Sequence, residues 1–454
     1  MRDARVDLVL SRIEKDPDVL NEVIQQLGND IRSIRFNAIL VLGELGRKSS
    51  LGVSELMECL NDNDWSICRE TVRSLGKIGN VSEKAITEIS NLIKNDESSI
   101  RKEAVIALGN IGIATKDAIS SLIAGLKDES EDVRKEAAES LGKIGSSDFK
   151  VISSLMNGVK DESTQVRTEA IDSLSKIGKK ATNAIPFLLK ALADKDWRVR
   201  KSVINTLTQI GNDAVPSLLK YMKHYNPIVR KGVIETLGEI RVSNPEVVEE
   251  IFLALREKKK GIRLKAADAL RNIGKPALPK LIEGIKNSNT KRRSLAIWAI
   301  GGMGYEASEG ISSLIGALDD KKVSVRIEAL RALGKLGDIA GNAVPSLMKL
   351  LKEDLAGNAV HALIALLKPS KARVRKETAI SLGKIGPSAR DAIPALLDAL
   401  EDKNDDVRWR ASEALGLIGI ETGEVIPSLN NLIHDKCDYV CEAAIVAMEQ
   451  IKKS

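Results

Sequence analysis

Apolar and polar residues along this chain follow a pattern that returns about every 33 residues. In most copies an apolar anchor is followed by apolar residues 4, 8 and 11 positions later, as in Val133, Ala137, Leu141 and Ile144. This spacing predicts a helix buried along one side. The thirteen anchors, which number repeats 1 to 13 in order, are Ile34, Ile67, Ile100, Val133, Val166, Val199, Val229, Ile262, Arg292, Val325, Val374, Val407 and Val440.

A further helix is predicted before each anchor, so that every repeat forms a helical hairpin. These first helices often begin with proline, which suits a first helical turn, at Pro186, Pro216, Pro279, Pro345, Pro394 and Pro427. The second helices, which contain the anchors, are followed by glycine 12 positions after the anchor in eleven repeats. Glycine there can adopt the left-handed conformation that ends a helix. Glycine nine positions after the anchor, as in Gly76, Gly109 and Gly383, indicates close approach of a neighbouring helix.

A period of this size predicts an all-α solenoid, because one hairpin cannot bury its own apolar face and must stack on its neighbours. The expected fold is a right-handed α-α superhelix of about thirteen hairpins. Most anchors are 33 residues apart, but two spacings are 30 and one is 49. Within the longest spacing, residues 341–347 are echoed at 357–363. The extra piece therefore resembles a duplicated first helix without its partner.

This insertion divides the predicted solenoid. Residues 1–352 hold an N-terminal cap helix, repeats 1 to 10 and the start of the insertion, and residues 353–454 hold the extra helix and repeats 11 to 13. The extra helix, near 353–368, is either an accident of duplication or a hinge or binding element.

Two polar positions recur as regularly as the apolar ones. Asp or Asn lies five residues before the anchor in ten repeats, and Arg follows the anchor in eleven. The arginines could form a track for nucleic acid. We favour a structural interpretation, because an acidic side chain in one turn and an arginine in an adjacent repeat can form a ladder of charge-assisted hydrogen bonds.

These residues resemble HEAT repeats, and more closely the HEAT-like repeats of phycobilisome lyases and of many uncharacterised microbial proteins. The shared features are Pro-x-Leu-Leu, the turn Asp, Val-Arg-x-x-Ala and Leu-Gly-x-Ile-Gly, over residues 16–454. The resemblance implies that the Val-Arg helices line a concave face where partners bind. Most members of the wider family are not enzymes.

No catalytic or cofactor motif accompanies the repeats. The iron-binding hydroxylases of the wider family use repeated His-Glu pairs, whereas this chain has only His224, His361 and His434, none followed by Glu. There is no phosphate-binding loop of the Gly-x-x-x-x-Gly-Lys type. A zinc site at His434, Cys437 and Cys441 matches no strong spacing pattern. We expect no metal and no cofactor, and the sequence favours a non-catalytic role without deciding it.

Charge is unevenly distributed along the chain. Residues 256–293 contain thirteen basic and three acidic residues, a net charge of +10 in a chain whose total is +6. Five of the twelve aromatic residues lie between 221 and 305. This segment is a solvated surface, a site for an acidic protein partner, or a site for nucleic acid. The candidate contact residues here are Lys258, Lys259, Lys260, Arg271, Arg292 and Arg293.

The four tryptophans avoid the predicted core positions. Trp298 and Trp409 fall on the part of the second helix expected to face the concave groove, and exposed tryptophan often dominates binding. Trp65 and Trp197 lie two residues before their anchors, where we expect them to pack in turns.

The bulk composition fits a helical protein with an aliphatic core: 43% of residues are apolar, 3% aromatic and 29% charged. Neither a signal peptide nor an apolar run long enough to cross a membrane is visible, and four cysteines do not form a disulfide framework, so we expect a cytoplasmic location. The leading hypothesis is a scaffold that binds a protein along the concave face, and an acidic protein is one candidate partner. The alternatives are nucleic-acid binding through repeats 8 and 9, and a lyase-type enzyme or lyase accessory subunit.

Overall fold

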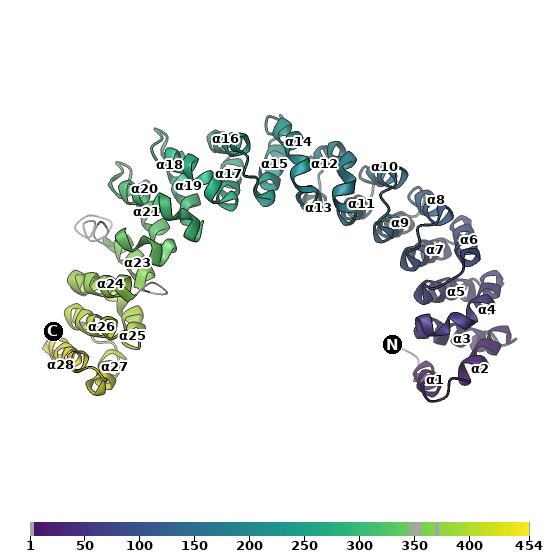
Figure 1. Cartoon of the computed structure of the whole chain (residues 1–454), viewed down its shortest axis with the longest axis horizontal. Helices are drawn as coiled ribbons and strands as arrows, with labels where there is room; N and C mark the ends of the chain where they lie inside the picture. The colour runs from purple at the N-terminus through teal and green to yellow at the C-terminus, as the bar shows by residue number, and fades with distance from the viewer. Residues whose placement is uncertain (1–3, 344–345, 347–355, 368–371, 454) are drawn as a thin grey trace. The chain divides into compact units, whose positions relative to one another are not determined.

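A computed structural model gives the structure of residues 4–343, 346, 356–367 and 372–453. Throughout these residues the regular structure is helical, with α-helices joined by turns and short 3-10 segments (Figure 1). The chain forms two compact units, Met1–Thr236 (unit 1) and Leu237–Ser454 (unit 2), with the division inside one helix of repeat 7. The boundary predicted after residue 352 lies outside the described residues.

Unit 1 is a stack of helical hairpins behind a single N-terminal helix, α1 (Ala4–Lys15). Its first helices are α2 (Val19–Gln25), α4 (Val53–Glu58), α6 (Glu83–Asn91), α8 (Lys116–Gly125), α10 (Phe149–Gly158), α12 (Ile185–Ala191) and α14 (Val215–Tyr221). Its second helices are α3 (Arg32–Leu45), α5 (Trp65–Ile78), α7 (Ser98–Ile111), α9 (Glu131–Ile144), α11 (Thr164–Ile177), α13 (Trp197–Ile210) and most of α15 (Pro227–Ile240). First and second helices form two layers (Figure 1).

Unit 2 continues the same hairpins, with one added helix. Its first helices are α16 (Pro245–Leu253), α18 (Leu278–Ile285), α20 (Ile311–Gly316), α25 (Ile393–Leu400) and α27 (Val425–Asn431). Its second helices are α17 (Lys260–Ile273), α19 (Thr290–Gly301), α21 (Val323–Leu336), α24 (Ala372–Ile385), α26 (Asp405–Ile418) and α28 (Asp438–Lys453). A further helix, α23 (Ala356–Leu367), packs against both α21 and α24. It lies where the extra helix was predicted, near 353–368. That it is a duplicated first helix without its partner stays a prediction, because part of the duplicated motif, with Pro345, lies outside the described residues.

The predicted helix boundaries and core are confirmed. Ten of the glycines that follow second helices have φ between 54° and 76°, which only glycine adopts readily. Val133, Ala137 and Leu141 are fully buried, and most of their described counterparts in other repeats are buried, whereas Ile34 and Ile144 are only partly buried. The described residues include no helix that is long and apolar enough to cross a bilayer.

Successive second helices approach one another at glycine. A Cβ added to Gly76 would lie 2.8 Å from the Cα of Ala107, and one added to Gly109 would lie 2.9 Å from the Cα of Ser140. The same contact joins a glycine nine positions after one anchor to a small residue seven positions after the next in eight places. The predicted close approach is therefore confirmed, and its cost of about 1 kcal/mol per helical glycine is offset by tight packing.

Some of these small residues also form hydrogen bonds between repeats. The hydroxyls of Ser74, Ser140, Ser173 and Thr206 donate to main-chain carbonyls 35 residues earlier, at 3.0, 2.8, 2.7 and 3.2 Å. Ser140 and Ser173 are almost fully buried. These bonds were not predicted, because a single serine in a helix usually indicates a surface position; its recurrence beside the glycine was the available signal.

The predicted arginine–aspartate ladder is present. Arg134 donates from Nε and Nη2 to the two carboxylate oxygens of Asp161, at 2.8 and 3.0 Å, and from Nη1 to main-chain carbonyls of its own turn. Each pair joins residues 27 apart in adjacent repeats. The observed pairs are Arg35–Asp62, Arg101–Asp128, Arg134–Asp161, Arg167–Asp194, Arg293–Asp320, Arg375–Asp402 and Arg408–Asp435.

The ladder is interrupted at the two 30-residue spacings. Arg200 and Arg263 bind the carbonyls of their own turns, but neither has a carboxylate partner within the described residues. The residues five before the next anchors are His224 and Asn287, neither of which carries a carboxylate. The ladder is therefore absent at these two steps, where the arginines bind their own turns.

The ladder makes stability depend on pH in a defined direction. The hydrogen bond from Arg408 lowers the pKa of Asp435, against burial, which raises it. For Asp128, Asp320 and Asp402 burial also raises the pKa, but hydrogen bonds from arginine and from the main chain outweigh it, so the pKa is lowered. A pKa lower in the folded than in the unfolded state stabilises the fold above the unfolded value, about 3.9, and this contribution is lost as pH falls below it. We expect thermal unfolding to shift to lower temperature below about pH 4; an unchanged midpoint down to pH 2.5 would contradict this.

Candidate interaction surfaces

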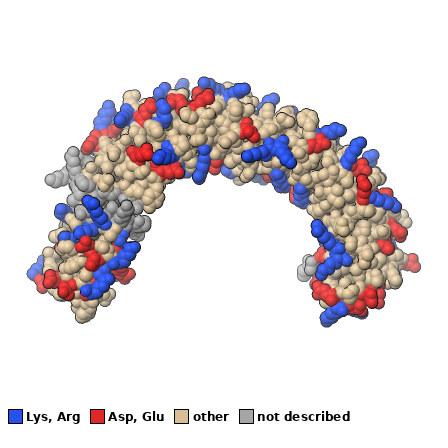
Figure 2. All heavy atoms as spheres, in the orientation of Figure 1, with Lys and Arg blue, Asp and Glu red and all other residues tan. Residues whose placement is uncertain are grey.

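Basic and acidic side chains are mixed over the visible surface (Figure 2). Of the predicted contact residues, Lys258, Lys259 and Lys260 are exposed at the start of α17. Arg271 is half-buried, with its guanidinium 5.3 Å from the ring centroid of Trp298 and 2.5 Å from Asp268. The exposed part of the predicted basic surface is thus smaller than its net charge of +10 suggests.

Two predicted contact residues lie inside the fold. Arg293 is 4% exposed and forms the ladder pair with Asp320, at 2.7 and 3.0 Å. Arg292 is 5% exposed, because it occupies the anchor position that points into the repeat. Neither side chain is available on the surface of this structure. The formal charge count treated all thirteen basic residues alike, and could not separate buried from exposed ones.

The tryptophans are placed differently from expectation. Trp298 and Trp409 are half-buried, and Trp409 packs edge-on against Tyr439 with ring centroids 5.3 Å apart and Arg410 over its ring. Trp65 and Trp197, which were expected to pack in turns, are 49% and 67% exposed. The side chain two positions before the anchor therefore lies on the surface in these two repeats. The two most exposed tryptophans are thus the two that were not predicted to be exposed.

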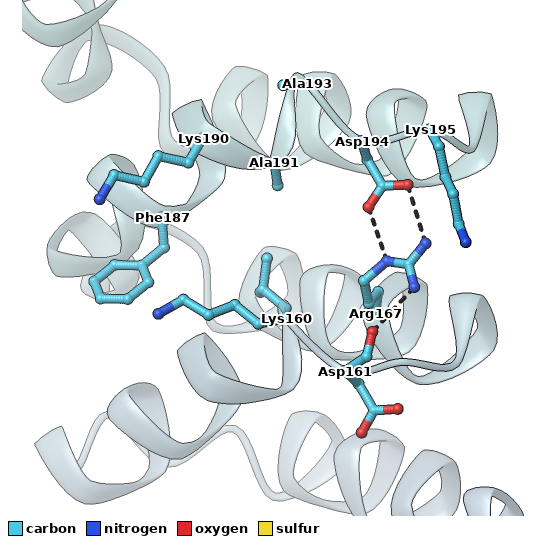
Figure 3. Close-up of a pocket in the computed structure, with 10 residues that line it drawn as sticks. Lys160, Asp161, Arg167, Phe187, Lys190, Ala191, Ala193, Asp194 and Lys195 are labelled. Carbon is cyan, nitrogen blue, oxygen red and sulfur yellow. Dashed lines mark hydrogen bonds and ion pairs between the residues drawn. The ribbon is translucent and has the colours of Figure 1, made fainter.

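A groove lies between repeats 5 and 6 in unit 1, with a volume of about 480 Å³ (Figure 3). Apolar atoms of Val159, Phe187 and Ala191 line it, and the turns that join first to second helices form its rim. At one end Lys160 and Lys190 extend beside Phe187, and at the other Arg167, Asp194 and Lys195 lie together (Figure 3).

The carboxylates in the groove are already neutralised. Asp194 accepts two hydrogen bonds from Arg167, at 2.8 and 3.0 Å, and Asp161 accepts two from Arg134. By contrast, three exposed lysines of the groove, Lys160, Lys190 and Lys195, have no ion pair in the described part of the chain. Lys195 even replaces the acid of other repeats, since Glu129 and Glu162 occupy the matching positions and contact ladder arginines. The groove is therefore positive.

Phe187 gives the groove its specific shape. Twelve positions before the anchor the other repeats have Ser, Glu, Ala or Lys, and Phe187 is the one aromatic residue. The amino group of Lys160 lies 4.9 Å from its ring centroid. The sequence pattern did not identify this site, although the single aromatic residue at a repeated position was a signal.

A second groove at the matching place provides a comparison. Between repeats 11 and 12, in unit 2, a groove has a volume of about 370 Å³. Its ladder pair Arg375–Asp402 corresponds to Arg167–Asp194, and Lys403 corresponds to Lys195. Ala395 stands in place of Phe187, and Asp398 in place of Lys190. The scaffold thus repeats, while the aromatic ring and the lysine excess belong to the groove between repeats 5 and 6.

The two grooves present charged and apolar side chains. Within the described ranges, no three His, Cys, Asp or Glu side chains come together as metal ligands. At the C-terminal end, the thiol of Cys437 donates to Asp405 at 3.2 Å, and this bond raises the pKa of Cys437. Cys441 donates to the carbonyl of Asp435. These thiols therefore act as hydrogen-bond donors in the fold. The arrangement between repeats 5 and 6 can bind an anion beside an apolar or aromatic group.

Comparison with known proteins follows the same repeats. A family model described as HEAT repeats matches in eight overlapping segments that run from residue 16 to residue 449. The chain is a HEAT-repeat protein. Its match is to the repeat in general and does not single out the phycobilisome lyases, so that finer resemblance stays a prediction.

Solved structures of proteins with low sequence identity show the same solenoid fold. Importin beta superposes with a TM-score of 0.53 at 14% identity, over 98% of this chain and 71% of importin beta. Kap121p gives a TM-score of 0.51 at 15% identity, over 97% of this chain and 57% of Kap121p. A search of curated protein sequences finds no match. At these identities the similarity concerns the fold alone.

Proposed function

We propose that this HEAT-repeat protein is a non-catalytic scaffold that binds an acidic segment of a protein partner. The observation that supports this most directly is the groove between repeats 5 and 6, where Phe187 lies beside Lys160 and Lys190 and a third lysine without an ion pair, Lys195, lies at the other end. A segment with acidic residues around an aromatic or large apolar residue complements this surface. The lysines attract the acids, and Phe187 provides an apolar contact.

The residues predicted from the sequence are proposed as additional contacts. Lys258, Lys259 and Lys260 offer exposed positive charge, and Trp298 with Arg271 and Trp409 with Arg410 offer half-buried aromatic surface on second helices. The partner would then bind along the concave face, in contact with these second helices. Nucleic acid is the competing ligand for the lysines.

The first test is fluorescence anisotropy of a labelled peptide with Asp and Glu flanking a central Phe, titrated with the full chain. We expect saturable binding that weakens with salt. In a double variant, Phe187→Ala and Lys190→Asp, the affinity should fall at least tenfold, because the groove then matches the one between repeats 11 and 12 at both positions. The matched control is Lys403→Glu, at the position in repeat 12 that corresponds to Lys195, which should leave the affinity unchanged.

Two outcomes would contradict the proposal. Equal peptide affinity in the double variant would remove the groove as the binding site. Tighter binding of labelled single-stranded or duplex oligonucleotides than of the peptide, lost after Lys258→Glu and Lys259→Glu, would instead assign a nucleic-acid function. A log–log salt slope of about −0.9 per phosphate contacted is expected for duplex DNA.

A further inference from the structure

Arg292 differs from every other deeply buried arginine in the described residues. Five arginines with 4–7% exposure, Arg101, Arg134, Arg167, Arg293 and Arg408, each donate from Nε and Nη2 to an aspartate. Arg292 is 5% exposed, but its Nε and Nη2 are enclosed without any hydrogen-bond partner. Arg69, Arg326 and Arg410 also have an enclosed Nε without a partner, yet each side chain is more exposed, and none has a second such enclosed atom in the described residues.

The surroundings of Arg292 do not supply a counter-charge. Its guanidinium lies 5.6 Å from the ring centroid of Phe252, a buried residue of α16. Burial lowers the pKa of Arg292, the charge of Arg256 lowers it further, and Glu283 opposes both. Glu283 itself is mostly exposed and forms an ion pair with Lys280 at 3.0 Å rather than with Arg292. Arg292, Arg256 and the ring of Phe252 therefore lie close to one another. The one carboxylate near them, that of Glu283, already forms an ion pair with Lys280.

The site lies at a place where neighbouring repeats form grooves elsewhere. Arg256 occupies the position in repeat 8 that Lys160 occupies in repeat 5, and Arg292 occupies the anchor position that Val199 occupies in repeat 6. The corresponding surface between repeats 5 and 6 is the groove shown in Figure 3. Gly284 of α18 leaves room for the ring of Phe252, since a Cβ added to Gly284 would lie 2.9 Å from that ring.

We infer that Arg292 and Arg256, between repeats 8 and 9, form a binding site for an oxyanion. The free edge of Arg292, Nε with Nη2, is the edge that binds a carboxylate in the five paired arginines, so a carboxylate or phosphate matches its geometry. The exposed Arg256 provides the second positive charge. A buried guanidinium is stable when such a partner supplies the missing hydrogen bonds. The ligand is either the carboxylate of an acidic side chain or a phosphate group.

The test measures thermal unfolding of the full chain in phosphate, in acetate and in chloride at equal ionic strength. We expect the midpoint to rise saturably with an oxyanion, because a ligand of the folded state stabilises it. In Arg292→Val the midpoint in chloride should be higher than in the unmodified protein, and the additional oxyanion-dependent rise should be lost. Arg256→Ala should require at least fivefold more oxyanion for half the effect, and Lys259→Ala serves as the unaffected control.

The outcomes distinguish a carboxylate ligand from a phosphate ligand, and both from the absence of a binding site. A saturable rise with acetate assigns the site to a carboxylate side chain, and a rise with phosphate alone assigns it to a phosphate group. The inference is overturned if no saturable rise occurs, or if Arg292→Val retains it, since phosphate also stabilises proteins by exclusion from their surface. Glu283→Gln should lower the oxyanion concentration needed for half of the rise in midpoint. A lower midpoint of this variant in chloride would show that Glu283 pairs with Arg292, and would overturn the inference. None of these readouts depends on the peptide groove of unit 1.

Discussion

Asp161→Ala is expected to lower the free energy of unfolding of unit 1 by about 3 kcal/mol. Asp161 is the acceptor for Nε and Nη2 of Arg134, whose exposure is only 7%. Its removal leaves a buried guanidinium without its main counter-charge, and breaking a buried pair from one side typically costs about 3–5 kcal/mol. We take the lower end because Glu162 still contacts Nη2 at 3.2 Å. Urea unfolding followed by far-ultraviolet circular dichroism measures the change.

The controls for this prediction come from the same turn. Glu162→Ala should change stability by no more than about 0.5 kcal/mol, because its side chain is 88% exposed and surface pairs contribute little. The double variant Arg134→Met with Asp161→Ala should recover most of the loss, since both charges are then absent. A loss in the double variant as large as in Asp161→Ala would show that the charge pair is not the cause.

Gly301→Val is expected to destabilise unit 2 by about 3 kcal/mol, at the upper end of the usual range for overpacking. Even a Cβ at Gly301 would lie 2.6 Å from both the Cα and the Cβ of Ala332, on the adjacent second helix. Because a main-chain atom cannot rotate away, α19 and α21 must separate, and their packing weakens. The decrease in midpoint on thermal unfolding gives the effect.

A second glycine shows whether the loss depends on this contact. Gly261 lies in α17 and would place an added Cβ in open space. Gly261→Ala should therefore leave the protein as stable or stabilise it by up to about 1 kcal/mol, since alanine favours the helix. A similar decrease for both variants would contradict the role assigned to the contact between α19 and α21.

The fold could be predicted because its contacts repeat at constant sequence spacing. The glycine at the end of each second helix, the arginine after the anchor and the aspartate in the turn all recur at fixed positions. Chance does not produce recurrence in ten or eleven of thirteen repeats, and each residue type has a recognised local role. The family match and the structure agree with the predicted repeats.

The candidate surfaces were less predictable because they depend on exceptions to the repeat. Net charge identified residues 256–293 but could not show that Arg293 pairs with Asp320 or that Arg292 lies inside the fold. Phe187 occurs once at its position, so periodicity gives it no weight. Whether its neighbouring lysines are compensated depends on side chains from two repeats, which sequence distance alone does not reveal.

The constant sequence spacing of the ladder also bears on how such a chain can change in length. The ladder bonds and the hydroxyl bonds of unit 1 join a residue to one in the adjacent repeat at a constant spacing, 27 residues from Arg134 to Asp161 and 35 residues from the hydroxyl of Ser173 to the carbonyl of Ala138. Excision of one period, residues 133–165, would bring Arg167 and Ser173 to the places of Arg134 and Ser140, with a suitable acceptor for each. Whole repeats can therefore be lost or gained in evolution without an intermediate that leaves a buried charge unpaired. An insertion or deletion of a few residues would instead separate a buried arginine from its aspartate.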